Sequence, residues 1–358
     1  MGEATIQIRL GRVSSPEYAR LVEDSPAAIF YHSPKYLNFL RDFFGSNVTE
    51  LHLFAWKSDE LVGALPAFVR NGEFGPVVNS LPFYGSHGGP ICRMGQSHEV
   101  IPKLIEAFWD SCDTLAAISS TIIDTVESEK ILFPPSRSTM LTDRRISQVS
   151  PLPATDDLND IEGAIFEMCH SKTRNLIRKG LKSGFRVAIE NSQESLKQIW
   201  ELHEQNMLEI GGLAKPWRAF EEIPKNFLSE TDYRVYTARQ NGELSSALLL
   251  FYFRDTVEYF TPVIASPYRS QQPLSLLIFT AMVDAVNDRG SRFWNWGGTW
   301  ESQQSLRHFK SRWGAIDRTY DYHVRLNPEI SLVNSQMLPK LMEAYPYFYI
   351  APMKREAT

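Results

Sequence analysis

Two stretches of the chain repeat one order of apolar and polar runs. In the first, apolar-rich runs flank the polar turn at 57–60, which predicts a β-hairpin. A further extended run follows at 76–85, then a helical pattern over 97–112 and an apolar strand over 116–123. The pattern thus predicts a hairpin, more strands, a helix and a closing strand.

The second stretch begins at 233 and repeats this order. Its hairpin signal is Asn-Gly within 240–243. A loop over 265–272 leads to a helix over 273–289, for which Pro273 suits the first turn and Gly290 the carboxyl-terminal cap. A strand over 292–296 follows. Helical patterns at 33–44 and 195–210 precede the two copies.

The repeat predicts an α/β protein with mixed sheets, built from two similar lobes. We expect the first lobe over 1–150, the second over 151–327, and a helical tail over 328–358 that packs on the lobes. A polar stretch over 144–160 is interpreted as the link. The alternative is that two unrelated α/β domains share this order by chance.

The composition of the chain argues against several classes of function. Hydrophobic residues make up 43% and charged residues 22%, which is typical of globular chains. A net charge of -5 gives no global basic field for DNA. Three scattered cysteines build no disulfide framework, and neither a signal peptide nor an apolar run long enough for a bilayer is recognised. We therefore expect a cytoplasmic protein and leave open attachment to the inner membrane surface.

A basic segment over 168–189 contains six Lys or Arg residues and no acid. If 171–182 is helical with Ser171 as its N-cap, Arg174, Arg178 and Lys182 form one stripe. Guanidinium groups at that spacing suit the phosphate oxygens of a diphosphate, a coenzyme tail or an RNA backbone. The alternative is a solvated charged face.

A second cluster, over 305–315, follows the strand that ends near Trp296 and therefore lies at the carboxyl end of the second sheet. We expect Lys310 there to stabilise an oxyanion or to handle protons, with Phe309 beside it and Trp296 as a pocket wall. The alternative is a helix-end lysine that a surface carboxylate holds.

The loop over 81–90 is rich in Gly and Pro and contains Tyr84 and His87, two candidates for proton transfer. The alternative is a tight turn with a packed tyrosine. The chain has no G-x-S-x-G elbow, no phosphate loop, no G-x-G-x-x-G and no histidine spacing typical of zinc. We expect neither a serine hydrolase nor a metal.

Several motifs resemble the FemAB-like branch of the Gcn5-related N-acyltransferase (GNAT) superfamily. They are SKTRNLIRKGLKSGFRV, YRSQQPLSLLIFTAMVDAVNDRGSRFWNWGG and LRHFKSRWGA, and LPFYGSHGGP is similar to a first-lobe loop of FemAB-related proteins of exopolysaccharide gene clusters. The resemblance implies two tandem lobes and transfer of an acyl or aminoacyl group to an amine without a covalent enzyme intermediate. It implies no tightly bound cofactor, a donor such as acyl-CoA or aminoacyl-tRNA, and an anionic acceptor, either small or lipid-linked, from peptidoglycan or exopolysaccharide synthesis.

The resemblance also assigns roles. It implies that Lys310 stabilises the transition state, that Arg174 and Arg178 meet the acceptor's phosphates, and that Tyr84 lines the acceptor cleft. The sequence departs from coenzyme-A-using relatives at 269–274, where Arg269 is a candidate substrate-binding residue but both glycines that expose pyrophosphate-binding amides are missing. The alternative function is a catalytically degenerate tandem protein that binds a glycan precursor or scaffolds polysaccharide assembly.

Overall fold

The computed structural model describes residues 5–81, 83, 85–125, 140–154, 160–327 and 337–351. The chain divides into two compact units. Met1–Arg145 and Thr319–Thr358 form the first, and Ile146–Arg318 forms the second. Each unit combines helices with a sheet of mixed strand direction, so the predicted α/β class is confirmed. Among the described residues, no helix has the length and apolarity needed to cross a membrane.

The first part of the stretch interpreted as a polar link, residues 144–151, is a strand. These residues belong to β9 (Met140–Pro151), and β15 (Ile316–Leu326) later returns the chain from the second unit to the first. The polar side chains of Ser147, Gln148 and Ser150 are buried in β9. Gln148 and Ser150 hydrogen-bond within the second unit. Polar side chains can be buried in a strand when they form hydrogen bonds. The polar sequence of β9 therefore resembles that of a linker.

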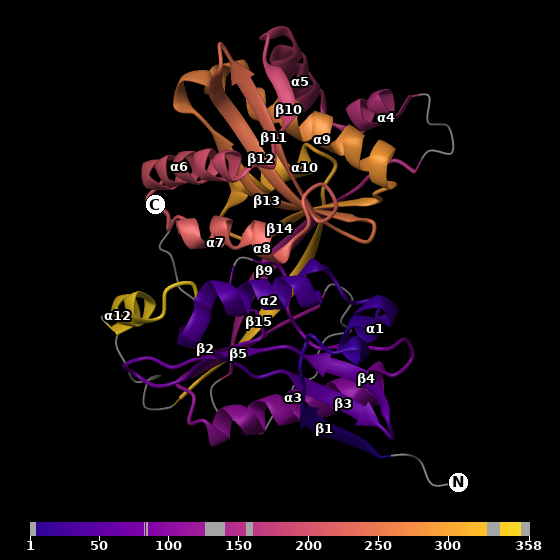
Figure 1. Cartoon of the computed structure of the whole chain (residues 1–358), viewed down its shortest axis with the longest axis vertical. Coiled ribbons are helices and arrows are strands. Elements are labelled where there is room, and N and C mark those ends of the chain that lie inside the picture. The colour runs from indigo at the N-terminus through magenta and orange to yellow at the C-terminus, as the bar shows by residue number, and fades with distance from the viewer. Residues whose placement is uncertain are drawn as a thin grey trace. The chain divides into compact units, whose positions relative to one another are not determined.

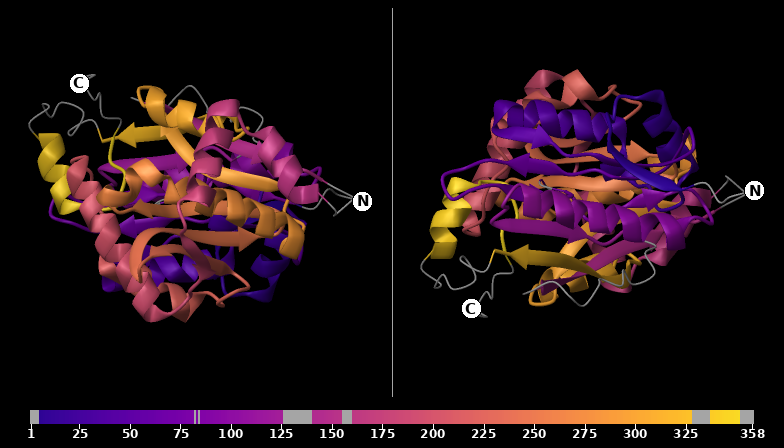
Figure 2. Two further views of the ribbon diagram at one scale, coloured as in Figure 1. Left: turned by 90° about the horizontal axis from the view of Figure 1, so that it is seen from above. Right: turned by 90° about the horizontal axis from the view of Figure 1, so that it is seen from below.

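In the first unit, one sheet has the order β1-β3-β4-β7, and β8, β6, β5 and β2 follow β15 in the other. Figure 2 (right) shows α2 and α3 on opposite sides of these strands. The elements are β1 (Ile6–Leu10), α1 (Pro16–Asp24), α2 (Pro34–Phe44), β2 (Val48–Glu50), β3 (Leu53–Lys57), β4 (Glu60–Leu65), β5 (Phe68–Arg70), β6 (Val77–Asn79), β7 (Ile91–Cys92), α3 (Ser97–Thr114), β8 (Ser119–Ile123) and α12 (Met337–Ala344), with the 3₁₀ turns η1 (Phe30–His32) and η2 (Gly45–Asn47).

The C-terminal segment 337–351 also packs on the first unit. The Tyr345 hydroxyl donates to the carbonyl of Gly75 at 2.6 Å, and Arg70 donates to the carbonyl of Pro346 at 2.9 Å. The rest of the predicted tail, 328–336 and 352–358, lies outside the described residues.

In the second unit, the strand order is β10-β11-β12-β13-β14-β9. Figure 1 shows α6 on one side of β11–β13 and α9 on the other. The elements are α4 (Ile161–Met168), α5 (Ser171–Lys182), β10 (Arg186–Ile189), α6 (Gln193–Glu209), α7 (Trp217–Glu221), α8 (Ile223–Asn226), β11 (Tyr233–Gln240), β12 (Glu243–Phe253), β13 (Thr256–Ile264), η4 (Ser266–Gln271), α9 (Pro273–Arg289), β14 (Phe293–Trp300) and α10 (Gln304–Ser311).

Local signals placed several of these elements correctly. α9 begins at Pro273 and ends at Arg289, and Gly290 caps it at φ 60°. The hairpin turn joins β11 to β12 through Asn241 and Gly242, whose φ angles are 52° and 85°. Positive φ at both turn positions is the geometry that favours Asn-Gly. On α5, however, the N-cap is His170 rather than Ser171.

The parallel strands β13 and β14 part soon after they begin. They pair over only three residues, which end at Glu258 on β13 and Asn295 on β14. Both strands continue beyond this point, to Ile264 and Trp300. On its other side, β13 has a register shift against β12 that leaves Phe260 without a partner in the register. The main chain of the two diverging segments must therefore find other hydrogen-bond partners.

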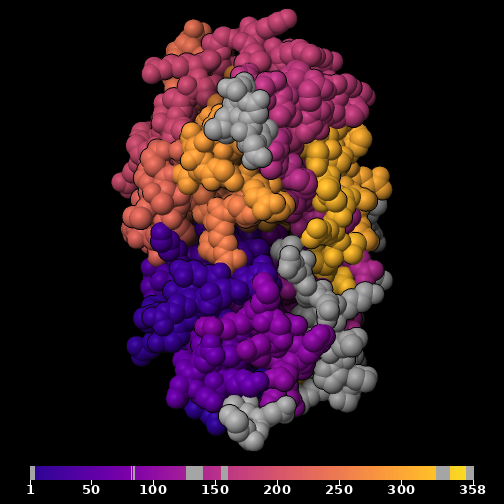
Figure 3. Space-filling model, turned by 90° about the vertical axis from the view of Figure 1, so that its right-hand side faces the viewer, coloured from indigo at the N-terminus to yellow at the C-terminus, as the bar shows by residue number. Residues whose placement is uncertain are grey.

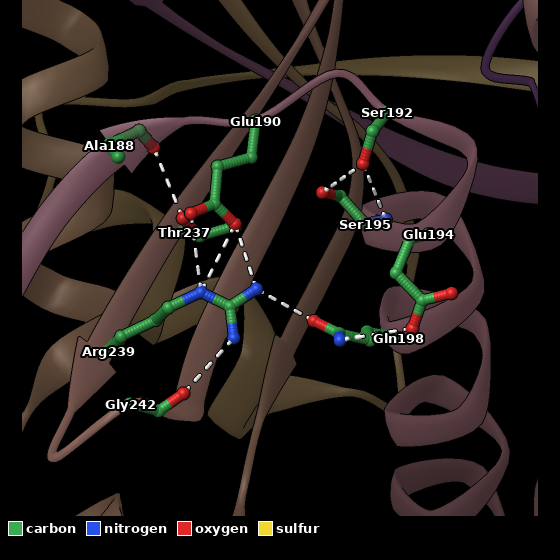
Figure 4. A network of polar contacts seen from close by, with 9 residues as sticks. All are labelled: Ala188, Glu190, Ser192, Glu194, Ser195, Gln198, Thr237, Arg239 and Gly242. Atoms are coloured by element: carbon green, nitrogen blue, oxygen red, sulfur yellow. Dashed lines mark hydrogen bonds and ion pairs between the residues drawn. The ribbon is translucent and has the colours of Figure 1, made fainter.

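An ion pair fastens the edge of this sheet to α6. The guanidinium of Arg239 contacts the carboxylate of Glu190 at 2.8 Å and donates to Gln198 of α6 at 2.7 Å (Figure 4). The hydrogen bond from Arg239 is the largest factor that lowers the pKa of Glu190. The pair thus connects the β10 end, β11 and the first turns of α6.

We predict that Arg239→Met lowers the free energy of unfolding at pH 7 by about 0.5 to 1 kcal/mol, the range for partly exposed pairs. Because the folded-state pKa of Glu190 lies below its unfolded value, this stabilisation exists above the unfolded pKa and is lost as pH falls. Urea unfolding at pH 7 and pH 3 measures the difference from wild type. Equal stability of the two proteins at pH 7 would contradict the assignment.

Candidate active site

Lys310 lies inside the second unit, near the end of α10. Its residue is 4% exposed, and its Nζ donates to Thr299 Oγ1 at 2.6 Å and to the carbonyl of Gly297 at 3.4 Å. Gly297 stands two residues beyond Asn295, the last residue of β14 that pairs with β13. The structure therefore places this amine on β14 just after the two strands part.

Burial changes the protonation of Lys310. It lowers the pKa of the ammonium from 10.5 to about 8, and the nearby charge of Asp317 opposes this decrease. Near neutral pH the side chain is therefore mostly charged. It carries a partly desolvated positive charge, which interacts more strongly with a developing oxyanion than a charge in water does.

A network of hydrogen bonds fixes the position of Lys310. Its partner Thr299 donates to Gln148 Oε1 at 3.2 Å, and Gln148 donates in turn to Asp317 at 2.9 Å. Asp317 also pairs with Arg307 of α10. The ammonium is thus held by one network with residues from β9, β14, α10 and the start of β15.

Aromatic rings pack beside this network. The Trp296 ring centroid lies 5.9 Å from that of Phe309 and 4.8 Å from that of Tyr259. Trp296 also donates its indole N–H to Ser150 at 2.8 Å, which fixes its orientation. The structure therefore brings together three of the predicted site residues, Lys310, Phe309 and Trp296.

The basic helix α5 lies at the surface of the second unit, beside α4 (Figure 3). Arg178 is exposed, and its guanidinium lies 4.8 Å from the ring centroid of Phe166. Arg174 pairs with Glu167 of α4, an acid that lies just outside the acid-free segment. The backbone N–H of His170 donates to Arg312 at 2.9 Å, so the start of α5 is tied to the end of the helix that carries Lys310.

The other end of α5 adjoins the turn before α9. Lys182 is exposed at this end, and the next residue, Ser183, donates to the carbonyl of Gln271 at 3.2 Å. Gly180 permits this approach, because a Cβ there would lie 2.9 Å from the carbonyl oxygen of Gln272. Arg269, from the same turn, pairs with Glu209 at the end of α6.

The turn before α9 does not fit a pyrophosphate in the manner usual for acyl-CoA. The amide of Gln272 donates to the carbonyl of Arg269 at 3.3 Å, Pro273 has no N–H, and Leu276 donates to the carbonyl of Gln272 at 3.2 Å. These main-chain groups are used within the turn and the helix. The amides of Gln272 and Leu276 are therefore not available to a phosphate bound here.

The predicted proton relays belong to the first unit. Tyr84 lies outside the described residues. His87 is 1% exposed; its Nδ1 lies 2.9 Å from the carbonyl of Asp124 and must donate to it, and its ring packs on Tyr320. Burial lowers the pKa of His87 to about 4, so the imidazole is neutral near pH 7.

The structure buries a second lysine that the sequence did not predict as a site residue. Lys215, between α6 and α7, is 6% exposed, and its Nζ donates to the carbonyl of Phe260 on β13 at 3.2 Å. The sequence around it, Ala-Lys-Pro after two glycines, has the pattern of an exposed loop and gave no signal of burial. In the part of the chain that the structure describes, no group of His, Cys, Asp or Glu side chains is arranged to hold a metal.

Part of the chain matches a known family. Residues 169–311, which include α5, β13, β14 and Lys310, match the family model of the acetyltransferase (GNAT) domain. No curated protein matches the sequence.

Among solved structures, the chain is similar to FemX, with a TM-score of 0.65, 13% identity, and coverage of 91% of this chain and 99% of that one. It is also similar to the C-terminal domain of a putative lysylphosphatidylglycerol synthetase from Agrobacterium fabrum (TM-score 0.58, 13% identity, coverage 94% and 98%). A tandem GNAT protein from the clavulanic acid biosynthesis pathway has a TM-score of 0.51, 11% identity, and coverage of 90% and 98%. At these identities the likeness shows the fold, which is that of tandem GNAT proteins.

We predict that Lys310 loses its proton near pH 8, below the pKa of about 10.4 typical of surface lysines. Competitive labelling with acetic anhydride across pH, read by mass spectrometry, measures this for each lysine. Thr299→Val removes an oxygen that accepts a hydrogen bond from the ammonium, and the pKa of Lys310 should decrease further. A Lys310 that titrates together with the surface lysines would refute the assignment.

Proposed function

We propose that this chain, whose residues 169–311 match the acetyltransferase (GNAT) domain, is an N-acyltransferase that acylates or aminoacylates an amine on an anionic precursor of the cell envelope or of a polysaccharide. GNAT domains take acyl-CoA as donor. Likeness to FemX and to a putative lysylphosphatidylglycerol synthetase supports an envelope precursor as acceptor. An aminoacyl ester of tRNA is the other donor that we consider.

The observation that carries this proposal is the buried ammonium of Lys310, held by Thr299 and the carbonyl of Gly297. In the proposed reaction, the acceptor amine attacks the donor carbonyl directly, and negative charge develops on the carbonyl oxygen. Lys310 stabilises this charge. One preorganised donor of this kind lowers the barrier by about 3 to 4 kcal/mol in other enzymes.

The exposed cations of α5 supply a second part of the proposal. Arg178 and Lys182 stand four residues apart on one helix face and would bind the phosphates of the substrate. Arg174, already paired with Glu167, would join them only by exchanging its partner. The amides of the turn before α9 bond internally, which supports phosphate binding by side chains rather than by the main chain.

We predict that Lys310→Met lowers kcat/KM by about a hundredfold or more, because the methionine keeps the volume and loses the charge. Release of thiol from acetyl-CoA with a UDP-linked muramyl pentapeptide as acceptor measures the rate, and alanyl-tRNA replaces acetyl-CoA in a parallel assay. In wild type, kcat/KM should fall above about pH 8, as Lys310 loses its proton.

The matched control is Lys57→Met, which removes a surface lysine that pairs with Glu99 in the first unit. It should leave kcat/KM unchanged. A folded Lys310→Met protein with normal turnover would exclude Lys310 from the reaction, and a wild type inactive with both donors would overturn the proposed function.

We predict a different result for Arg178→Ala. It should raise KM for a phosphorylated substrate several-fold with little change in kcat, since Arg178 binds rather than reacts. The wild-type KM should also rise with salt, and the variant should respond less steeply. A KM that is independent of ionic strength in both proteins would rule out the phosphate contact.

A further inference from the structure

Lys215 is held against the main chain of β13. Its Nζ donates to the carbonyl of Phe260 and to Thr261 Oγ1, each at 3.2 Å, and lies 4.7 Å from the centroid of the Phe260 ring. Both oxygens are neutral acceptors. The amine therefore sits on β13, the strand against which α6 packs.

Hydrogen bonds at two residues of α6 hold the segment that carries Lys215 and fix α6 on the sheet. The backbone N–H of Lys215 donates to Nε2 of His203 on α6 at 3.0 Å. The side-chain amide of Asn206, one turn later, bonds both the N–H and the carbonyl of Ile264 on β13, at 3.0 and 2.9 Å. α6 is thereby tied to β13, and the segment before α7 is tied to α6.

The position of Lys215 relates it to the reaction site. Phe260 stands two residues beyond Glu258, the last residue of β13 that pairs with β14. Lys310 contacts the carbonyl of Gly297, which stands two residues beyond the corresponding residue of β14. Two buried amines thus lie on the two strands that diverge, one on each.

We propose that Nζ of Lys215 is the catalytic base that removes a proton from the acceptor's ammonium group before the amine attacks the acyl donor. This role rests on the proposed acyl transfer. One proton moves from the acceptor to Nζ, the N–C bond forms as the bond from the carbonyl carbon to sulfur or oxygen breaks, and the leaving group takes a second proton from the attacking nitrogen. Nζ then releases its proton to water.

Two contacts of Lys215 are with neutral oxygens, the carbonyl of Phe260 and Thr261 Oγ1, so neither contact adds a negative charge that would favour the protonated amine. Burial lowers the pKa of Lys215 to about 7, so a substantial fraction is neutral under working conditions.

His203, Glu258 and Glu222 are buried titratable groups on the elements around Lys215. Burial and the charge of Lys215 lower the pKa of His203 to about 4, so His203 stays neutral near pH 7. Glu258 on β13 accepts two hydrogen bonds from Asn295, and Glu222 at the end of α7 pairs with Lys225.

The test is the pH dependence of kcat/KM with acetyl-CoA and the UDP-linked muramyl pentapeptide. For wild type we expect a rise through about pH 7 and a fall above about pH 8. Lys215→Met should lower the maximal kcat/KM by about a hundredfold, which is within the range for general bases. The pH at which kcat/KM rises should increase toward the pKa of the acceptor's own amine. Lys215→Arg should be as slow, because a guanidinium stays charged.

The control Lys225→Met should keep the wild-type profile, and thermal unfolding should show each variant folded. A cationic brace or a phosphate ligand would instead retain its rate in Lys215→Arg. Activity of that variant near the wild-type level, or an unchanged rise near pH 7 in Lys215→Met, would overturn the inference alone. An inactive wild type would overturn the proposed function as well.

A chemical variant tests the base directly. Lys215→Cys treated with 2-bromoethylamine regains an amine of nearly the same length that is less basic than lysine. We expect activity to return with the rise shifted to lower pH, while treated wild type is unchanged. Restored activity without that shift would show that the amine only positions the segment.

Discussion

The separation of β13 and β14 is the constraint on which the candidate site of this protein depends. Parallel strands normally satisfy each other's main chain, and these two do so for only three residues. Beyond that point, side chains supply some of the hydrogen bonds that the two strands no longer give each other. Asn295 accepts from the amide of Gly297, Lys310 donates to its carbonyl, and Lys215 donates to the carbonyl of Phe260.

Two lysines in similar positions acquire different properties from their surroundings. Both lose water on burial, which disfavours the charged form. Lys310 has Asp317 nearby, which restores part of the charge, whereas burial is the cause that acts on Lys215. The pKa values separate to about 8 and about 7. One amine therefore suits the stabilisation of negative charge and the other the acceptance of a proton, as in other sites where paired groups divide acid and base roles.

Local sequence signals predicted much of the fold. Pro273 and Gly290 bound α9 correctly, and Asn-Gly marked the turn between β11 and β12. β9 was misread, because its buried polar residues are satisfied by partners far along the chain. The sequence also did not predict that Arg174 pairs with Glu167, an acid just outside the basic segment.

Of the two buried lysines of the candidate site, the sequence predicted one and not the other. Lys310 was predicted, because it follows the closing strand of the repeat and lies in a motif that resembles the family. Lys215 was not, since only the packing of α6 on β13 buries it. The chemistry of a lysine in a polar loop cannot be predicted without the strand against which it folds.

Hydrogen–deuterium exchange with saturating acetyl-CoA tests most directly whether the acyl donor binds where the strands part. The account predicts slower exchange in peptides covering 259–264 and 296–299, which lie beyond the residues that pair β13 with β14. Unchanged exchange in both segments, with protection elsewhere in the chain, would contradict it.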